Sequence, residues 1–253
     1  MRITVASYNI HKCIGGIDRR CDPSRIAEVL LRQGPDVALL QEVAQNGRRC
    51  SGEPQVEFLS RALGLPHTAY FVNVRLGARS GEYGNAILSR FPIAATENVD
   101  LTIGGRKARS VLHACLRVTM PGPHRRTLHV FNLHLGLSAR ERRQQLRRFL
   151  SCAPFASLGP RTPALVAGDF NDVWGRLGKL LEPAGFRGPR RPIGTFPAWA
   201  PVRALDSMMT RGELEIVDLE RPRTALARRA SDHLPLFASI RLGPAETAGR
   251  GPS

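Results

Sequence analysis

Lysine is nearly absent from this sequence of 253 residues, whose only lysines are Lys12, Lys107 and Lys179. Acidic residues are also few. They number 21 against 37 Lys and Arg, so arginine carries almost all of a formal net charge of +16. Such a charge favours a polyanionic partner, for example nucleic acid, a phosphoinositide or an anionic membrane surface. Arg, Ala, Gly and Pro are all abundant, and a bias toward GC-rich codons explains the arginine content equally well. Charge alone therefore identifies no substrate.

Cysteine pairs with the spacing Cys-x-x-Cys are also missing. The sequence contains five cysteines, Cys13, Cys21, Cys50, Cys115 and Cys152. An odd number without paired spacing argues against a disulfide framework and against a structural zinc site, and it is typical of a reducing compartment. No stretch approaches the roughly 18 apolar residues that a transmembrane helix needs, and no signal-peptide pattern precedes the first apolar run. We therefore expect a cytoplasmic protein.

The composition is that of a globular protein, with 42% hydrophobic and 23% charged residues. A chain of this length fits one large α/β or two-sheet domain, and no internal repeat or interior linker divides it. We predict a single catalytic domain over residues 1–242, followed by a flexible tail at 243–253. We also expect a monomer.

The first part of the chain predicts a strand, a helix and a second strand. Residues 2–8 are apolar enough for a buried strand, which delivers Asn9 and His11 on one side of its end. A helix follows Asp22 and Pro23, and a second core strand ends on the carboxylate of Glu42. In such a crossover unit both strand ends open on the same edge of a sheet, so we expect Asn9 and Glu42 to be neighbours.

The middle of the chain has the pattern of strands separated by turns, at 68–74, 84–88, 93–101, 109–118 and 127–133. Ser138 and Glu141 form a capping box that begins a helix running to about Ala153. Later segments predict strands at 164–167, 204–209, 214–219 and 234–242, with a helix around 175–181 and a basic loop at 221–230.

The segment Ala164–Val173 places a carboxylate and an amide together. Side chains alternate along an extended chain, so Asp169 and Asn171 point to the same side. A carboxylate can take a proton from water, and the amide can orient that water or a phosphoryl oxygen. In isolation the same residues would also form an ordinary Asx turn.

Similar polar residues follow other apolar strands. They are Asn9, Glu42, Asn132 with His134, Asp206, and Asp232 with His233. A strand end that merely meets solvent has no need of these residue types in particular, so we expect them to form one site. Oxygen ligands without clustered cysteines indicate a hard cation, Mg²⁺ or Mn²⁺, with Glu42 and Asp232 as its anionic ligands.

Six strings resemble motifs of the endonuclease/exonuclease/phosphatase superfamily, which includes pancreatic-type deoxyribonuclease, abasic-site endonucleases, neutral sphingomyelinases and inositol polyphosphate phosphatases. They are Tyr8-Asn-Ile-His11, Leu40-Gln-Glu-Val43, Gly84-Asn-Ala-Ile-Leu-Ser-Arg90, Asn132-Leu-His-Leu135, Gly168-Asp-Phe-Asn-Asp172 and Ser231-Asp-His-Leu-Pro235. The resemblance runs from residue 3 to about residue 241. It implies an α/β fold, namely a four-layer α/β/β/α sandwich of two packed mixed sheets with helices outside, and hydrolysis of phosphoesters with a divalent metal ion.

The resemblance also implies roles for individual residues. Glu42 resembles the principal Mg²⁺ ligand, with Asn9 and Asp232 near the metal. Asp169 resembles the residue that positions or deprotonates the attacking water, and Asn171 one that orients phosphate or water.

His233 resembles the histidine that stabilises charge on the phosphoryl oxygens, and Asp206 the carboxylate that orients it. A carboxylate beside a histidine raises the pKa of the imidazole and fixes its tautomer. His134 and Glu82 resemble a second His/Glu pair that helps to protonate the leaving oxygen.

We predict three substrate contacts, at His11, Asn85 and Arg229. At the end of the first strand many members have Asn-x-Asp or Asn-x-Asn, whereas this chain has His11, which either binds the metal or contacts phosphate. The loops 187–191 and 221–229 are further candidates for polyanion contact. Asn132 is interpreted as structural, the cysteines are interpreted as small core or incidental residues, and the remaining histidines have no motif partners. Those histidines are His67, His113, His124 and His129.

The leading hypothesis is a divalent-metal-dependent phosphodiesterase that prefers nucleic acid. The segment before Asp206 lacks an aromatic pocket of the abasic-site type, which disfavours a repair enzyme. One alternative is a phosphodiesterase for phospholipid headgroups or other small phosphoesters. Another is a catalytically silent polyanion-binding module, which would have lost the equivalents of Glu42, Asp169 or His233.

Overall fold

The structure is a computed structural model that describes residues 1–45, 53–76, 81–120 and 124–243. One sheet consists of β1 (Arg2–Asn9), β2 (Val37–Gln45), β3 (His67–Arg75), β4 (Glu82–Ser89), β10 (Leu214–Glu220) and β11 (Leu236–Leu242). The other consists of β5 (Ile93–Asp100), β6 (Ser110–Thr119), β7 (Arg125–His134), β8 (Ala164–Asp169) and β9 (Asp206–Arg211). Their strand orders are β10-β11-β1-β2-β4-β3 and β5-β6-β7-β8-β9.

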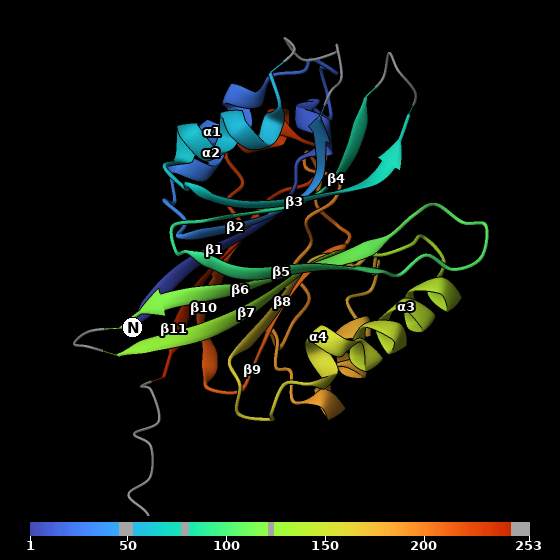
Figure 1. Ribbon diagram of the computed structural model, residues 1–253. Helices are drawn as coiled ribbons and strands as arrows, with labels where there is room; N and C mark the ends of the chain where they lie inside the picture. The colour runs from blue at the N-terminus through green and yellow to red at the C-terminus, as the bar shows by residue number, and fades with distance from the viewer. Residues whose placement is uncertain (46–52, 77–80, 121–123, 244–253) are drawn as a thin grey trace, which may run out of the picture.

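Helices cover the outer faces of both sheets (Figure 1). The α-helices are α1 (Pro23–Leu31), α2 (Gln55–Leu63), α3 (Ala139–Ser151), α4 (Ala153–Ala156) and α5 (Ala225–Ala230). Three short 3-10 helices, η1 (His11–Cys13), η2 (Leu177–Leu180) and η3 (Glu182–Ala184), complete the set within the described residues. In Figure 1, α1 and α2 lie on the six-stranded sheet, and α3 and α4 lie on the five-stranded sheet.

Three hydrophobic layers hold this arrangement together. The central layer lies between the two sheets and includes Leu39, Leu116 and Leu165, all fully buried. A second layer packs the six-stranded sheet against α1, α2 and α5, and a third packs the five-stranded sheet against α3 and α4. The predicted four-layer sandwich of two mixed sheets is therefore confirmed.

The strand pairing gathers polar strand ends at one edge of the sandwich. β1 and β2 are parallel, with Asn9 opposite Gln41, so Asn9 and Glu42 lie on adjacent strands as predicted, although β2 continues past Glu42 to Gln45. β7 and β8 are also parallel, and their register sets His134 opposite Asp169. β9 runs antiparallel to β8 and sets Asp206 opposite Asp169.

Most strands and helices match the sequence pattern, but two predicted segments differ. The basic loop contains α5, which begins because the Thr224 hydroxyl accepts a hydrogen bond from the Ala227 amide at 3.1 Å. In place of one helix around residues 175–181, the chain forms the short helices η2 and η3. Pro183, near the start of η3, lacks a backbone N–H group and cannot donate the hydrogen bond that would continue the helix from the preceding turn.

The cysteines also differ from expectation. Cys13, Cys115 and Cys152 are free thiols, whereas Cys21 is disulfide-bonded, although the number and spacing of the cysteines argued against a disulfide framework. No described helix is long and apolar enough to span a membrane. The predicted tail lies outside the described residues except for Gly243.

Candidate active site

Asp169, at the end of β8, is the centre of the polar edge. The Asn9 side-chain amide donates to Asp169 Oδ2 at 3.0 Å, and the Asn171 backbone amide donates to Oδ1 at 2.8 Å. Two histidines face the same carboxylate, with His134 Nε2 at 3.4 Å and His233 Nε2 at 3.8 Å from Oδ2. Residues from separate strands and strand ends thus meet around one carboxylate that is 2% exposed.

The residue before Asp169 allows this close approach. Gly168 has a φ of +145°, and a Cβ atom there would lie 1.9 Å from the carbonyl oxygen of Leu133 on β7. Any side chain would therefore push β8 away from β7. Glycine at this position lets the two strands carry His134 and Asp169 into contact.

His233 is held by a second carboxylate. Its Nδ1 lies 2.8 Å from Asp206 Oδ2, and the same oxygen accepts a hydrogen bond from the Thr195 hydroxyl at 2.5 Å. This pairing leaves Nε2 of His233 directed at Asp169. We define Asp169, Asp206 and His233 as the edge site; their ligand atoms all lie within 4.8 Å of one another.

Burial and mutual charge set the protonation states of the edge site. Burial, together with the nearby charge of Asp206, raises the pKa of Asp169 to about 6. Burial lowers the pKa of His233, but the charges of Asp206 and Asp169 outweigh it and raise that pKa to about 10. Near neutral pH, Asp169 is therefore an anion poised to take a proton, and His233 is a cation beside it.

His134 has the opposite electrostatic environment. Burial and the positive charge of Arg109 hold the pKa of His134 well below its usual value. Its imidazole is neutral near pH 7, a state that suits hydrogen bonding rather than the predicted donation of a proton to a leaving group.

Glu42 lines a recess together with His134 and pairs with Lys12. The Lys12 ammonium contacts Glu42 Oε2 and also lies 4.9 Å from the centre of the Tyr83 ring. Burial would raise the pKa of Glu42, but Lys12 outweighs it, so the pKa is lowered and Glu42 is a carboxylate. Its positive φ of +54° coincides with a register shift in the pairing of β2 with β4, which directs Glu42 out of the regular ladder.

His11 lies between Glu42 and Asp232. Its Nδ1 is 3.0 Å from the Ile14 carbonyl oxygen and 3.7 Å from Asp232 Oδ1, while its backbone amide donates to Asn9 Oδ1 at 3.1 Å. The negative charges of both carboxylates act on His11, although burial is the larger effect and lowers its pKa.

The predicted metal ligands Asn9, Glu42 and Asp232 lie at this same edge. Among the described residues of this edge, however, the group of three whose acidic or histidine ligand atoms lie within 4.8 Å of one another is the edge site. Glu42 and Asp232 are not part of that group. The Asn9 amide group points to Asp169, and the Lys12 ammonium contacts Glu42. The oxygen atoms of Asn9, Glu42 and Asp232 fit a hard divalent cation, which prefers oxygen ligands. Glu42 already pairs with the Lys12 ammonium, and a metal ion could take the place of that ammonium beside the carboxylate.

Positive φ angles concentrate near the site. Among the described residues six non-glycine positions have positive φ, and all but Arg19 lie in η1 or at Glu42 and Asn171. Such conformations are unfavourable for most side chains and persist where surrounding contacts enforce them. Their clustering marks this edge as a functional region.

The predicted amides have different surroundings. Asn171 directs its side-chain amide at the Leu135 carbonyl oxygen, 2.9 Å away. Asn132 is fully buried and donates to the carbonyl oxygens of Leu40 and Ala86 at 2.8 and 2.9 Å, bridging the two sheets as a structural residue. Asn85 lines a small recess of about 10 Å³ together with Glu42, Tyr83, Arg109 and His134.

Arg109 is a site residue that the sequence did not reveal. It lies immediately before β6, is 5% exposed, and its Nε atom has no hydrogen-bond partner. Burial lowers its pKa, while the charges of Asp169 and Glu42 act in the opposite direction. A buried guanidinium with an unused donor beside two carboxylates is suited to an anionic ligand. One arginine among many carries no motif, so only the fold distinguishes it.

Two predicted residues, Glu82 and Arg229, are directed away from this edge of the sandwich. Glu82 forms an ion pair with Arg75 at 3.4 Å, and alternation along β4 directs it to the face opposite Tyr83 and Asn85, so its predicted pairing with His134 is corrected. Arg229 lies in α5, where its exposed guanidinium is 3.8 Å from Asp18. α5 therefore turns Arg229 toward the loop after η1 rather than toward the edge site.

A larger pocket of about 520 Å³ adjoins the edge site at Asp206. Its walls come mainly from the segments between β8 and β9, and four cationic side chains line it, Arg176, Lys179, Arg187 and Arg190. This lining includes residues 187–190 of the predicted polyanion-contact loop at 187–191. It places positive charge next to a cluster of acids and histidines.

Comparison with known proteins agrees with this geometry. The endonuclease/exonuclease/phosphatase family matches residues 6–233. The chain belongs to this family. The uncharacterized protein YbhP of Escherichia coli strain K12 is 31% identical over 251 residues, covering 94% of this chain and 96% of YbhP.

Solved structures show the same family fold. An endonuclease/exonuclease/phosphatase from Beutenbergia cavernae aligns with a TM-score of 0.80 at 23% identity, covering 98% of this chain and 73% of that one. D. rerio TDP2, complexed with a single-stranded DNA product, aligns with a TM-score of 0.69 at 18% identity, covering 95% and 99% of the two chains. Endonucleases, exonucleases and phosphatases all hydrolyse phosphoesters, so the family assigns that class of reaction and leaves the substrate open.

Proposed function

We propose that this protein is a divalent-metal-dependent phosphodiesterase whose preferred substrate class is nucleic acid. The observation that carries the proposal is the edge site, in which an anionic Asp169 and a cationic His233 face each other in a buried setting. A base and a charge-stabilising cation held at one point are the groups that attack of water on a phosphodiester requires.

The protein's own residues divide the work. Asp169 accepts a proton from the attacking water, and Asn9 and the Asn171 backbone amide hold its carboxylate in place. His233, oriented by Asp206, donates hydrogen bonds to the phosphoryl oxygens as negative charge grows on them. Arg109 adds a second cation from the facing wall. His134 stays neutral and orients the substrate by hydrogen bonding.

Glu42, with Asn9 and Asp232, would hold a Mg²⁺ or Mn²⁺ ion. Such an ion supplies polarisation of the phosphoryl group and neutralises its charge. Lys12, which contacts Glu42, would then turn to the substrate phosphate or to solvent.

Charge supports nucleic acid as the substrate class. The formal net charge is +16, and the pocket beside Asp206 presents four cationic side chains. TDP2, which shares the fold, binds single-stranded DNA. Phospholipid headgroups and other small phosphoesters are the rival class, because an anionic membrane surface attracts the same charge.

A substrate panel separates these classes. Initial rates with Mg²⁺ or Mn²⁺ would be measured on single-stranded DNA, duplex DNA, RNA, phospholipid vesicles and inositol phosphates. We expect cleavage of a nucleic acid and binding that weakens steeply with salt. Faster cleavage of vesicle lipids than of any nucleic acid would show that phospholipids are the substrate class and would contradict our preference for nucleic acid. Absence of hydrolysis on every substrate would support the alternative of a catalytically silent binding module.

A further inference from the structure

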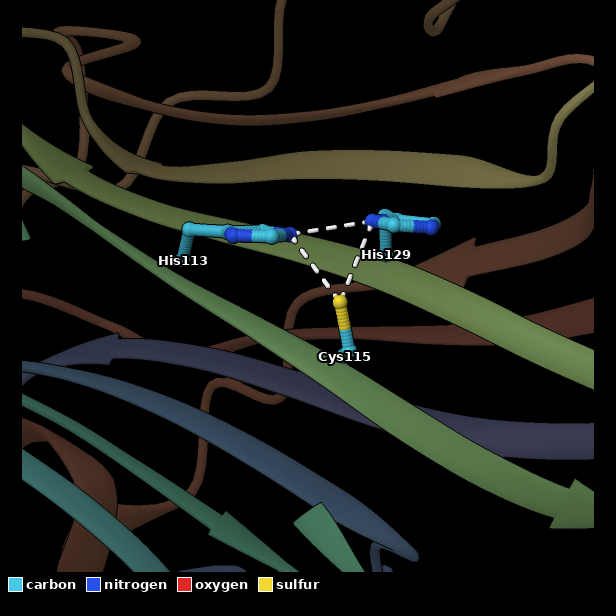
Figure 2. Close-up of side chains that lie close together, drawn as sticks. All are labelled: His113, Cys115 and His129. Carbon is cyan, nitrogen blue, oxygen red and sulfur yellow. Dashed lines mark hydrogen bonds between the residues drawn. The ribbon is translucent and has the colours of Figure 1, made fainter. Parts of the chain in front are cut away.

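Two histidines and a cysteine meet on the outer face of the five-stranded sheet, away from the edge site. His113 Nε2 lies 3.0 Å from His129 Nδ1, and Cys115 Sγ lies 3.7 and 3.4 Å from these two nitrogens. Figure 2 shows the two rings and the thiol pointing toward one another from neighbouring strands. We call these three residues the hairpin cluster.

The hairpin formed by β6 and β7 brings these residues together. Side chains alternate, so His113 and Cys115 project from the same face of β6, and the register sets Cys115 directly opposite His129 on β7. Ala114 and Leu116, which project from the other face, lie in the core between the sheets. The hairpin cluster is therefore built into the strand register and does not depend on a loop.

Aromatic packing fixes one side of the hairpin cluster. His113 is 6% exposed and stacks on Phe131, with ring centres 4.5 Å apart, and Phe131 in turn meets Phe155 of α4 edge to face. The rings of His113 and His129 are within 3° of parallel. Cys115 and His129 are only partly buried, which leaves the opposite side open to solvent.

The spacing of the three donor atoms fits a metal ion. Tetrahedral zinc with its ordinary bond lengths separates two nitrogens by about 3.4 Å and a nitrogen from a sulfur by about 3.6 Å. The observed separations of 3.0, 3.4 and 3.7 Å differ from these by less than about half an ångström. Solvent can supply the fourth ligand on the open side.

We propose that the hairpin cluster is a second metal site, specific for a borderline-soft divalent transition metal of the Zn²⁺ class. Two imidazoles and a thiolate select such an ion over Mg²⁺, which prefers oxygen ligands.

The imidazoles of the hairpin cluster are in the form that a metal ion requires, whereas the thiol must lose its proton. Burial, with the charge of His129, lowers the pKa of His113 to about 4, so this imidazole is in the neutral form that a metal requires. Burial raises the pKa of the Cys115 thiol, so a bound metal ion would have to displace its proton to solvent.

Cobalt provides a test on the full-length protein that is independent of hydrolysis. Titration with Co²⁺ should produce a thiolate-to-metal charge-transfer absorption at one equivalent, because only a sulfur ligand gives this band. Co²⁺ bound among carboxylates and imidazoles at the edge site gives none. Zn²⁺ should abolish the band by competition, while Mg²⁺ at large excess should not.

Variants assign the band to its ligands. Cys115→Ser should remove it, and Cys115→Ser and His129→Gln should each weaken Zn²⁺ binding by at least about 100-fold, since loss of an outer-shell partner alone costs roughly 10–100-fold. His124→Gln, which changes an exposed histidine near the same hairpin, should leave Zn²⁺ binding unchanged.

X-ray absorption at the zinc edge of the wild-type protein should show one sulfur neighbour and requires no variant. A hydrogen-bonded triad without a metal function would give no charge-transfer band and no sulfur neighbour. Either of these results, or a band that persists in folded Cys115→Ser, would overturn the proposal.

Discussion

The edge site and the hairpin cluster are both groups of three titratable side chains, but the protein assembles them differently. The edge site joins the end of β8, the start of β9 and the segment before β11, which are far apart in the sequence. The hairpin cluster comes from one antiparallel pair, within residues 113–129. The first is fully buried and rich in oxygen, whereas the second is partly open and contains sulfur. Location at a strand end, donor chemistry and burial together separate the proposed hydrolytic site from the proposed site for a borderline-soft metal.

Their histidines show the same contrast. His233 faces two carboxylates, which raise its pKa to about 10, whereas His113 faces His129 and an aromatic ring, and its pKa falls to about 4. β7 contributes a histidine to each region, from opposite faces of the strand. His134 points between the sheets toward Asp169, and His129 points outward into the hairpin cluster. One strand therefore contributes to both proposed sites, which differ in chemistry.

The largest expected effect comes from Asp169→Asn. Loss of the base should reduce hydrolysis by about 1,000-fold, within the range observed for removal of a general base. Asp100→Asn, the same change at an exposed strand end, should leave the rate unchanged. The Co²⁺ charge-transfer band should persist in Asp169→Asn, and its loss would show that the two sites are not separate.

Removal of the partner of His233 should have the next largest effect. Asp206→Asn keeps an acceptor for the imidazole but removes the charge that raises its pKa, so kcat should fall by about 100-fold. The descending limb of the pH profile should also move to lower pH. An unshifted limb in a folded variant would indicate that Asp206 is only structural.

The pH dependence of the wild type follows from the same pair. Asp169 must be deprotonated, so kcat/KM should rise with pH through about 6. His233 must be protonated, so kcat/KM should fall through about 10. Imidazole titration by NMR should show His233 charged and His113 neutral near pH 7. A neutral His233 at that pH would contradict the electrostatic account.

The cationic pocket beside Asp206 should contribute to binding more than to chemistry. Arg187→Ala with Arg190→Ala should raise KM for nucleic acid several-fold and reduce the salt dependence of binding by about two units of slope. Arg32→Ala, which changes an arginine paired on the exposed side of α1, serves as the control. An equal loss on a short phosphodiester that is too small to reach this pocket would place the two arginines in the chemical step instead.

The smallest effect is expected for Glu82→Gln. Since Glu82 pairs with Arg75 on the face opposite the recess, the rate should stay within about twofold of the wild type. A loss comparable to that of Asp206→Asn would restore the predicted pairing of Glu82 with His134.

The family resemblance implied the sandwich and the roles of Asp169 and His233, which come from strand ends of different sheets. Parallel-strand logic predicted only that Asn9 and Glu42 are neighbours, because the ends of adjacent parallel strands open on the same edge of a sheet. Neither predicted Arg109, whose importance lies in its burial and not in its neighbours along the chain. The direction of the Glu82 side chain depended on exact register, which a short string does not fix. The hairpin cluster left a trace in the spacing of His113 and Cys115, but pairing with His129 required the register of β6 with β7.

The central claim is that the edge site hydrolyses phosphodiesters with a divalent metal ion. Its most direct test is the initial rate of cleavage of single-stranded DNA by the wild-type protein with Mg²⁺, with excess chelator, and with Mg²⁺ restored. The account predicts cleavage with Mg²⁺, none with chelator and recovery when Mg²⁺ returns. Turnover that continues undiminished in excess chelator would contradict it.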